Sequence, residues 1–441
     1  MAADQDRLAA YEALVRIDKN RAYSNIELNS VLRKSTEAGS GKDQVRNPGF
    51  VRELTYGVTE NRTLLDYYIG SLVNNGIDSV KRELKVLLRM GIYQILYMDS
   101  VPDHSAVDET VKIAKTLFRG KEGFVNGVLR SFLRGKAQDP HDIADKEERL
   151  HILYSCDKGI VHLLISQYGE ETAENILRIS LEAPPLYIRV NTLKTNASVL
   201  SERLRDLGFW VNDNYDHANH GLKDILMVSG KGIIESEPFI DGDFFVQDAS
   251  SAGAVAALEP CPEETVIDVC AAPGGKTFSA AIMMDNRGCI HAMDLHDNKL
   301  RALMKQAGRL GIDIIDTEQH DAKEVCDKYM GIADKVICDV PCSGLGVLRR
   351  KPEIKDRPLR NDGRDIAEIQ YRILSASSEY VKAGGKLMYS TCTVNKTENQ
   401  EVTERFAAEH SGFSMCKSSL TLPESGGPDG FYYCIFVKDS K

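Results

Sequence analysis

Two cysteines stand in settings that suggest covalent chemistry. Cys342 lies in the segment DVPCSG (339–344), and Cys392 lies in the segment STCT (390–393). Each segment follows an apolar run typical of a buried strand, so both thiols are expected at strand ends. A thiolate is a strong nucleophile that forms covalent intermediates with electrophilic carbon. Other cysteines fit the commoner role of small buried hydrophobes: Cys270, Cys289 and Cys338.

A second feature is a glycine turn after a short apolar run. Gly274 and Gly275 permit a tight turn from a buried strand into a helix, whose first N–H groups suit an anionic ligand. The P-loop and dinucleotide glycine patterns do not match, which favours a nucleoside ligand without a pyrophosphate, such as S-adenosylmethionine. An ordinary strand-to-helix turn is the alternative. The expected cofactor loop comprises Cys270, Ala271, Ala272, Pro273, Gly274, Gly275 and Lys276.

Three acidic residues follow further predicted strands. The carboxyl ends of parallel strands meet at one edge of a doubly wound sheet, so these carboxylates are expected in one crevice. Asp294 is placed to bind a ribose diol, Asp321 to bind an adenine amino group, and Asp339 to lie beside both thiols. The predicted strands span residues 265–269, 289–293, 313–318, 335–338 and 385–391.

These segments resemble the motifs of the RNA (cytosine-C5) methyltransferases. The resemblance also includes an entry motif at 246–251 and covers roughly residues 152–438. It implies that Cys392 attacks C6 of a cytosine, so that C5 becomes nucleophilic enough to accept a methyl group. It further implies that Cys342 helps remove the C5 proton and release the product. We assign Asp339 to hydrogen bonds with the base near N3 and N4, with Lys276 assisting.

Composition narrows the class of protein. In 441 residues no apolar run reaches the length needed to span a bilayer, and the N-terminus lacks the form of a signal peptide. Ten cysteines without CxxC pairs predict reduced thiols and no metal site. We therefore expect a soluble cytoplasmic protein without an obligate protein partner.

The charge is unevenly distributed along the chain. Residues 1–136 hold 21 Lys and Arg against 17 Asp and Glu, a net charge of +4, and the remainder brings the total to −10. A basic cluster follows Cys342 and is placed to neutralise an RNA backbone, although a solvated loop is the alternative. The cluster contains Arg349, Arg350 and Lys351, followed by Lys355, Arg357 and Arg360.

Four segments are expected along the chain. Residues 1–136 read as helices and resemble the RNA-binding domain of the NusB family, and 137–149 is a polar linker. Residues 150–242 form a small RRM-like α/β subdomain, including a helix over 160–180. Residues 243–441 form the α/β Rossmann-like methyltransferase domain. Two residues of the subdomain are expected at the RNA cleft: Arg189 and Asn191.

The NusB-like domain points to one group within the family. Its fusion to this methyltransferase resembles the RsmB (Sun or Fmu) group of bacterial 16S rRNA methyltransferases, which implies cytosine 967 of small-subunit rRNA as the target. One alternative is an inactive scaffold that serves antitermination, against which the retained thiols and acids argue. The other is a DNA-type cytosine methyltransferase with Cys342 as nucleophile, against which the Cys392 motif argues.

Overall fold

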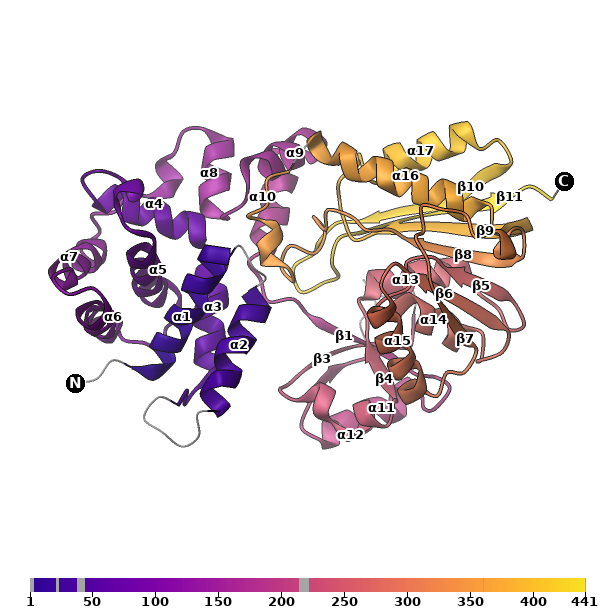
Figure 1. Cartoon of the computed structure of the whole chain (residues 1–441), viewed down its shortest axis with the longest axis horizontal. Helices are drawn as coiled ribbons and strands as arrows, with labels where there is room; N and C mark the ends of the chain where they lie inside the picture. Colours follow the sequence, from indigo (N-terminus) through magenta and orange to yellow (C-terminus); the bar gives the residue numbers. More distant parts are fainter. Residues whose placement is uncertain (1–3, 21–23, 38–43, 214–221, 360, 441) are drawn as a thin grey trace. The chain divides into compact units, whose positions relative to one another are not determined.

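The computed structural model describes residues 4–20, 24–37, 44–213, 222–359 and 361–440. The chain forms two compact units, one of residues 1–181 with 351–358 and one of 182–350 with 359–441. Figure 1 labels the helices and strands of both. Among the described residues, no helix is both long and apolar enough to cross a membrane.

The first unit is helical, as the apolar periodicity of its sequence predicts. Its core is built around α5, which is buried along most of its length and packs against α1, α3, α6 and α7. The α-helices are α1 (Gln5–Asn20), α2 (Ser24–Glu37), α3 (Pro48–Glu60), α4 (Arg62–Leu72), α5 (Arg82–Tyr97), α6 (Asp103–Leu117), α7 (Glu122–Leu133), α8 (Lys146–Leu153), α9 (Lys158–Tyr168) and α10 (Glu170–Ile179). The short 3-10 helices are η1 (Ile77–Ser79), η2 (Pro140–Asp142) and η5 (Pro352–Ile354).

The single helix predicted over 160–180 is wrong. The chain breaks there into α9 and α10 because Gly169 adopts φ 80° and ψ 166°, a non-helical conformation that glycine accepts more readily than other residues. Helices α8 to α10 cluster with the helical unit, although the sequence suggested a boundary near residue 150. The predicted domain limits describe segments that resemble separate families. Such segments need not coincide with the compact units of the fold, so the limits remain a prediction.

The segment 351–358 returns to the helical unit. Lys355 is buried there, and its Nζ donates to the carbonyl oxygens of Glu60 at 3.3 Å and Tyr154 at 3.2 Å. Burial lowers the pKa of the Lys355 ammonium. The expectation that Lys355 belongs to an exposed basic cluster is therefore wrong. Arg360, also expected in that cluster, lies outside the described residues.

The second unit contains two sheets. The smaller is antiparallel, in the order β2-β3-β1-β4, with strands β1 (Leu186–Val190), β2 (Trp210–Asn212), β3 (Ile225–Ser229) and β4 (Phe244–Val246). Helix α11 (Ala197–Asp206) and the short α12 (Glu237–Ile240), which follows η3 (Ile233–Glu235), pack on one face of it. This arrangement agrees with the small α/β subdomain expected from the sequence.

The larger sheet has seven strands in the order β10-β11-β9-β8-β5-β6-β7. Strands β5 to β9 are parallel, and β11 joins antiparallel to β9. The strands are β5 (Thr265–Asp268), β6 (Cys289–Asp294), β7 (Ile315–Gln319), β8 (Ala333–Asp339), β9 (Val381–Thr391), β10 (Phe413–Thr421) and β11 (Phe431–Lys438). All five predicted strands are present. Their limits lie within two residues of the expected ones, except that β9 begins four residues earlier than predicted.

Helices cover both faces of this sheet. Figure 1 shows α16 and α17 on one face and α13 to α15 towards the other, and two separate apolar cores lie beneath them. The helices are α13 (Ala249–Leu258), α14 (Gly275–Met283), α15 (Asp297–Leu310), α16 (Arg364–Ser378) and α17 (Gln400–Glu409), with η4 (Asp327–Tyr329) and η6 (Asn361–Gly363) in the connections. The doubly wound order reverses between β5 and β8, and ligands bind at such a switch point.

Candidate active site

The glycine turn lies at the carboxyl end of β5. Gly274 adopts φ 113°, and a Cβ there would come within 2.4 Å of the Phe278 ring, so a side chain at this position would clash. Helix α14 begins at the next residue, Gly275, and the first N–H groups of a helix have no intrahelical partner. The turn thus presents backbone donors at the switch point, as the sequence predicted.

The two predicted cysteines lie next to each other. Cys342 follows β8, Cys392 follows β9, and these strands pair in parallel, so the two Sγ atoms lie 3.1 Å apart. The hydrogen bond shared with Cys392, together with burial, raises the pKa of the Cys342 thiol well above its ordinary value.

A buried carboxylate holds the turn that carries Cys342. Glu398 Oε2 accepts hydrogen bonds from the backbone N–H of Ser343 at 2.8 Å and from Gln370 Nε2 at 3.1 Å. Gln370 Nε2 also donates to the carbonyl of Pro341 at 2.9 Å, and Ser343 Oγ lies 2.8 Å from Thr393 Oγ1. Because Thr393 directly follows Cys392, these bonds fix the two cysteine turns relative to each other.

Asp339 and Lys276 form an ion pair beside the cysteines. Lys276 Nζ lies 2.7 Å from Asp339 Oδ2, and Ser390 Oγ donates to Asp339 Oδ1 at 2.7 Å. The Lys276 ammonium also lies 4.9 Å from the centre of the Phe431 ring, within range of a cation–π contact. These contacts restrain the Lys276 ammonium and the Asp339 carboxylate in positions from which they can bind a polar ligand.

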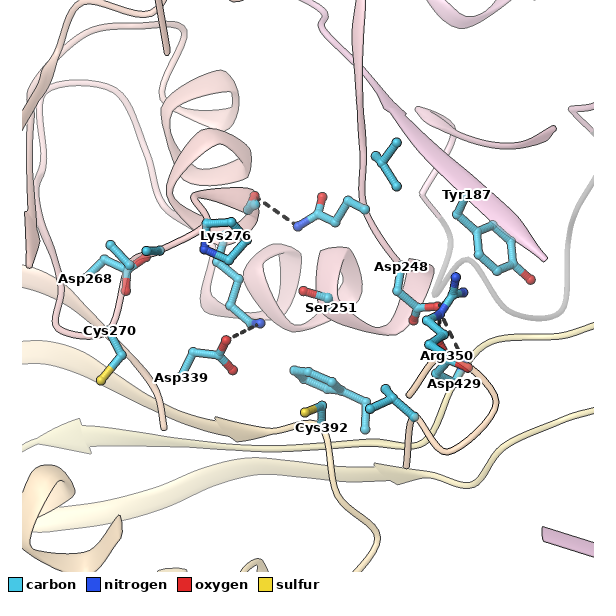
Figure 2. Close-up of a pocket in the computed structure, with 18 of the residues that line it drawn as sticks. Tyr187, Asp248, Ser251, Asp268, Cys270, Lys276, Asp339, Arg350, Cys392 and Asp429 are labelled. Atoms are coloured by element: carbon cyan, nitrogen blue, oxygen red, sulfur yellow. Dashed lines mark hydrogen bonds and ion pairs between the residues drawn. The ribbon is translucent and has the colours of Figure 1, made fainter. Parts of the chain in front are cut away.

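A cavity of about 300 Å³ brings these groups together. Figure 2 shows the Lys276 side chain reaching towards Asp339, with Cys392 nearby. Cys392 lines this cavity, whereas Cys342 is not among the lining residues. The predicted site residues that line it are Cys270, Ala271, Ala272, Pro273, Gly275, Lys276, Asp339, Arg350 and Cys392. Lining residues that the sequence analysis did not assign to the site include Tyr187, Gln247, Asp248, Asp268, Asp429 and Phe431.

Asp268 is an acid that the sequence analysis missed. It ends β5 and is fully buried, and its Oδ2 accepts a hydrogen bond from Thr277 Oγ1 at 2.7 Å. Its Oδ1 has no hydrogen-bond partner among the described residues. Burial raises the pKa of the Asp268 carboxyl to about 7. Asp268 could have been identified from the sequence, because it is an acidic residue at the end of a buried strand, just before a glycine turn.

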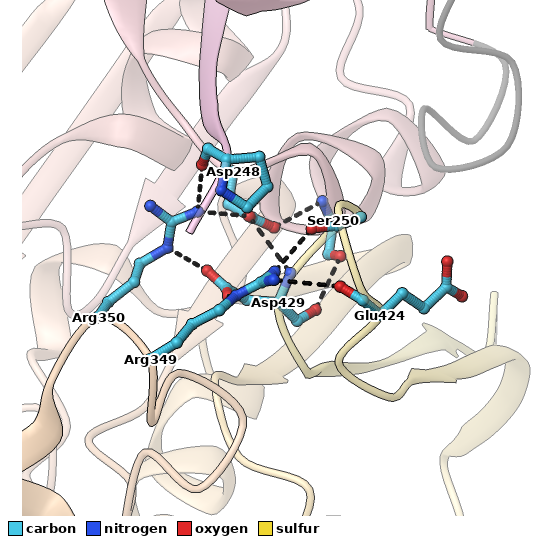
Figure 3. Close-up of polar contacts among 8 residues, drawn as sticks. Asp248, Ser250, Arg349, Arg350, Glu424 and Asp429 are labelled. Carbon is cyan, nitrogen blue, oxygen red and sulfur yellow. Dashed lines mark hydrogen bonds and ion pairs between the residues drawn. The ribbon is translucent and has the colours of Figure 1, made fainter. Parts of the chain in front are cut away.

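Arg350 lines one wall of the cavity. Arg350 pairs with Asp429, lies 3.4 Å from Asp248 Oδ2, and donates to the carbonyl of Pro185 at 2.9 Å. Burial and the neighbouring Asp429 carboxylate raise the pKa of Asp248 to about 6. Figure 3 shows Arg349 and Arg350 converging on Asp429. The Pro-Asp-Gly turn before β11 was a weak sequence signal for Asp429.

Three residues expected to contact RNA are buried instead. The Arg349 guanidinium pairs with Asp429 Oδ1 at 2.6 Å and donates to two backbone carbonyls. Arg189 pairs with Asp224 at 2.8 Å, and Asn191 Nδ2 donates to the carbonyls of Gly242 and Leu310. Each of these side chains serves the fold, so its predicted role at the RNA surface is withdrawn. Lys351 is exposed, as predicted.

The two acids assigned to the nucleoside lie outside the cavity. Asp294 ends β6, and its Oδ1 accepts the N–H of His296 at 3.0 Å. Asp321 follows β7, and its Oδ1 accepts the N–H of Lys323 at 3.1 Å. The backbone N–H and the ammonium group of Lys323 lower the pKa of the Asp321 carboxyl. Both acids follow carboxyl ends of parallel strands, as the predicted cofactor crevice requires, and their roles remain a prediction.

The sheet order, the glycine turn and the acids at the strand ends define the class of S-adenosylmethionine-dependent methyltransferases. A family model described as 16S rRNA methyltransferase RsmB/F matches residues 255–434. The NusB family matches residues 4–134, and a ferredoxin-like domain of RsmF/B-like methyltransferases matches residues 159–223. The NusB-like domain expected from the sequence is thereby confirmed.

Whole-chain similarity gives the family. The probable ribosomal RNA small subunit methyltransferase B of Bacillus subtilis is 37% identical and covers 97% of this chain and 98% of its own. A protein of the same name from Synechocystis is 32% identical over 95% of this chain and 92% of its own. The crystal structure of a methyltransferase homologue from Pyrococcus horikoshii aligns with a TM-score of 0.59 and 25% identity, covering 67% of this chain and 100% of that one. The chain belongs to the ribosomal RNA small subunit methyltransferase B family.

The residues present fit S-adenosylmethionine, the cofactor of this class. The unpaired Oδ1 of buried Asp268 offers an acceptor for the cofactor's ammonium group, and the α14 amides offer donors for its carboxylate. Asp294 and Asp321 are available for the ribose and the adenine. When bound, the cofactor supplies an electrophilic methyl group.

Proposed function

We propose that this protein methylates C5 of a cytosine in small-subunit rRNA through a covalent bond between Cys392 and C6. The observation that carries the proposal is the 3.1 Å approach of Cys392 Sγ to Cys342 Sγ, with Cys392 lining a cavity beside Asp339 and Lys276. Cytosine C5 is a poor nucleophile until an adduct forms at C6, and a thiol at this place supplies that adduct.

Each side chain has a role in this scheme. The Cys392 thiolate forms the C–S bond at C6, and the ring electrons move towards C5 and N3. Asp339 hydrogen-bonds the base near N3 and N4, and Lys276 orients the Asp339 carboxylate through their 2.7 Å ion pair. Cys342, after losing its own proton to solvent, accepts the C5 proton of the methylated base. The C6–S bond then breaks, and the Cys392 thiolate is regenerated.

The position of the two thiols favours Cys392 as the nucleophile. Cys392 lines the cavity, whereas Cys342 is not among its lining residues. This assignment distinguishes the proposal from a DNA-type mechanism, in which Cys342 would attack.

The rRNA target is proposed from the family. The relatives are named as ribosomal RNA small subunit methyltransferases, and the group resemblance points to cytosine 967 of 16S rRNA. We assign RNA affinity to the NusB-like residues 4–134 and to two exposed basic side chains, Arg350 and Lys351. Because the proposed substrate is rRNA, the proposed location is the cytoplasm.

A denaturing gel of cysteine variants tests the mechanism. The protein is incubated with unmethylated 16S rRNA and labelled S-adenosylmethionine, and the labelled base is mapped. Cys342→Ala is expected to give a retarded protein–RNA band, because the adduct forms but its release is slow. Cys392→Ala is expected to give neither the band nor the methylated base.

A third cysteine provides the control. Cys416→Ser changes an exposed thiol on β10 and should behave as the wild-type protein. A band from Cys392→Ala and none from Cys342→Ala would make Cys342 the nucleophile. Methylation at a cytosine other than 967 would leave the chemistry standing and overturn the proposed target.

A further inference from the structure

A second cluster of reactive side chains lies at the other end of the parallel strands. Cys289 and His291 occupy the first and third positions of β6, so their side chains leave the same face of the sheet. Asp316 lies on β7, directly opposite His291 in the parallel register. Cys289 is only partly buried, which corrects its expected role as a buried hydrophobe.

The donor atoms of this cluster converge. Cys289 Sγ lies 3.5 Å from His291 Nε2 and 3.9 Å from Asp316 Oδ2, and one donor atom from each residue lies within 4.8 Å of the others. A tetrahedral zinc ion has bonds of about 2.3 Å to sulfur and about 2.0–2.1 Å to nitrogen or oxygen, which puts its ligand atoms about 3.5 Å apart. The observed spacing is therefore close to that of a zinc site.

We propose that Cys289, His291 and Asp316 bind a zinc ion that joins β6 to the edge strand β7. One sulfur, one imidazole nitrogen and one carboxylate oxygen form a ligand set that zinc accepts, and three protein ligands leave a fourth position for water. On binding, the Cys289 thiol releases its proton to solvent. The proposal departs from the expectation, drawn from the absence of CxxC pairs, that the chain holds no metal.

The positive charge nearest to the cluster is compensated by a carboxylate. The nearby Lys328 ammonium is held by Glu318 at 2.6 Å, so its charge is compensated by a carboxylate. Tyr329 donates to the same Glu318 at 2.8 Å, and its ring packs 4.7 Å from the His291 ring. The Tyr329 ring therefore restricts the orientation of the His291 imidazole.

The proposed ion has a structural role. None of its three ligands lines the cavity that contains Cys392, and β7 is the last strand in the order of the sheet. An edge strand lacks a neighbour on one side, so a metal bond to β6 adds a link that backbone pairing there does not supply. Zinc is therefore expected to stabilise the fold.

Metal titration of the full-length protein tests the site. After treatment with a chelator, the protein is titrated with Co²⁺, whose absorption reports tetrahedral geometry and thiolate ligation, and with Zn²⁺ in competition with a chromophoric chelator. We expect one equivalent of each metal, a thiolate-to-cobalt charge-transfer band, and a higher thermal unfolding midpoint with Zn²⁺.

Two ligand variants are compared with one control. Cys289→Ser should abolish the charge-transfer band, and Asp316→Asn, which changes an exposed side chain, should weaken Zn²⁺ binding at least about tenfold. Cys416→Ser removes another thiol from a strand of the same sheet and should bind as the wild-type protein.

The catalytic thiols are the competing zinc site. Because Cys342 Sγ and Cys392 Sγ lie 3.1 Å apart, the titration is repeated with the Cys342→Ser/Cys392→Ser double variant. Retention of the band in this variant supports the proposed site. Loss of the band in the double variant, its persistence in Cys289→Ser, or no tetrahedral cobalt spectrum in the wild-type protein would each overturn the proposal.

Discussion

The two ends of the parallel sheet use cysteine differently. At the carboxyl ends, Cys342 and Cys392 lie between a buried hydrogen-bond network and a cavity. At the amino ends, Cys289 lies in a partly exposed cluster with His291 and Asp316. We propose covalent catalysis for the thiols at one end and metal binding for the thiol at the other. The difference comes from the neighbouring groups that each end supplies.

The acidic residues at the two ends of the sheet also differ in burial and in their ion pairs. The cavity wall contains Asp429, which is buried and pairs with two arginines, whereas Asp316 is exposed. Buried pairs are costly to break because the remaining charge loses its partner, whereas exposed pairs contribute little. We therefore expect changes at the carboxyl ends to have much larger effects.

The largest effect is expected from the nucleophile. Cys392→Ala should lower the methylation rate by roughly a thousandfold or more, because losing a nucleophile removes the covalent route. Cys289→Ser should lower it far less, since its thiol lies outside the cavity. Single-turnover methylation of 16S rRNA measures both rates. If both variants lost a comparable part of the methylation rate, the two ends of the sheet would not differ in their importance for catalysis.

The buried ion pair should have the next largest effect. Arg349→Met leaves Asp429 without one of its buried partners and is expected to cost about 3–5 kcal/mol in the free energy of unfolding. Arg301→Met, which breaks the exposed Arg301–Asp297 pair on α15, should cost only about 0.3–0.5 kcal/mol. Urea unfolding measures both values. Equal losses in the free energy of unfolding would mean that the buried ion pair stabilises the protein no more than the exposed one.

The third effect depends on pH. The folded protein raises the pKa of Asp268 from 3.8 to about 7, so it favours the neutral carboxyl. The resulting contribution to stability is present below about pH 4 and is lost as the pH rises through about 7. Relative to Asp268→Asn, the wild-type protein should therefore lose about 2–4 kcal/mol across this range. Urea unfolding at several pH values measures the difference, and a difference independent of pH would contradict the raised pKa.

The smallest effect concerns the cofactor. Asp294→Ala removes an acceptor proposed for the ribose hydroxyls and should weaken S-adenosylmethionine binding by roughly tenfold. Asp297→Ala changes a nearby exposed acid at the start of α15 and serves as the matched control. Titration calorimetry measures both affinities, with circular dichroism to verify the fold. Unchanged affinity in Asp294→Ala would remove this residue from the cofactor site.

Local sequence patterns predicted the catalytic end of the sheet well. The strands, the glycine turn and the adjacency of Cys342 and Cys392 follow from short apolar runs and from the winding rule of parallel sheets. The helix predicted over 160–180 failed at Gly169, because apolar periodicity does not report a backbone that turns non-helical at one residue. Local patterns therefore predict which elements form more reliably than where they end.

The partners of charged side chains could not be predicted in this way. Arg349 looked like an RNA-binding residue until the structure placed it against Asp429, 80 residues further along the chain. Arg189 and Asn191 likewise bond to distant backbone and side-chain atoms. Charge type and spacing are local properties, whereas burial depends on which distant segments fold over a residue.

The sequence by itself determined five strands of the larger sheet, the turn that needs glycine at position 274, and the pair of thiols at neighbouring strand ends. Only the tertiary structure decided that Cys392, and not Cys342, lines the cavity, and that Asp268 closes one side of it. It also decided that Cys289, His291 and Asp316 meet across β6 and β7. The physical reason is that backbone preferences act over a few neighbouring residues, whereas cavities and ligand clusters arise where separate strands pack side by side.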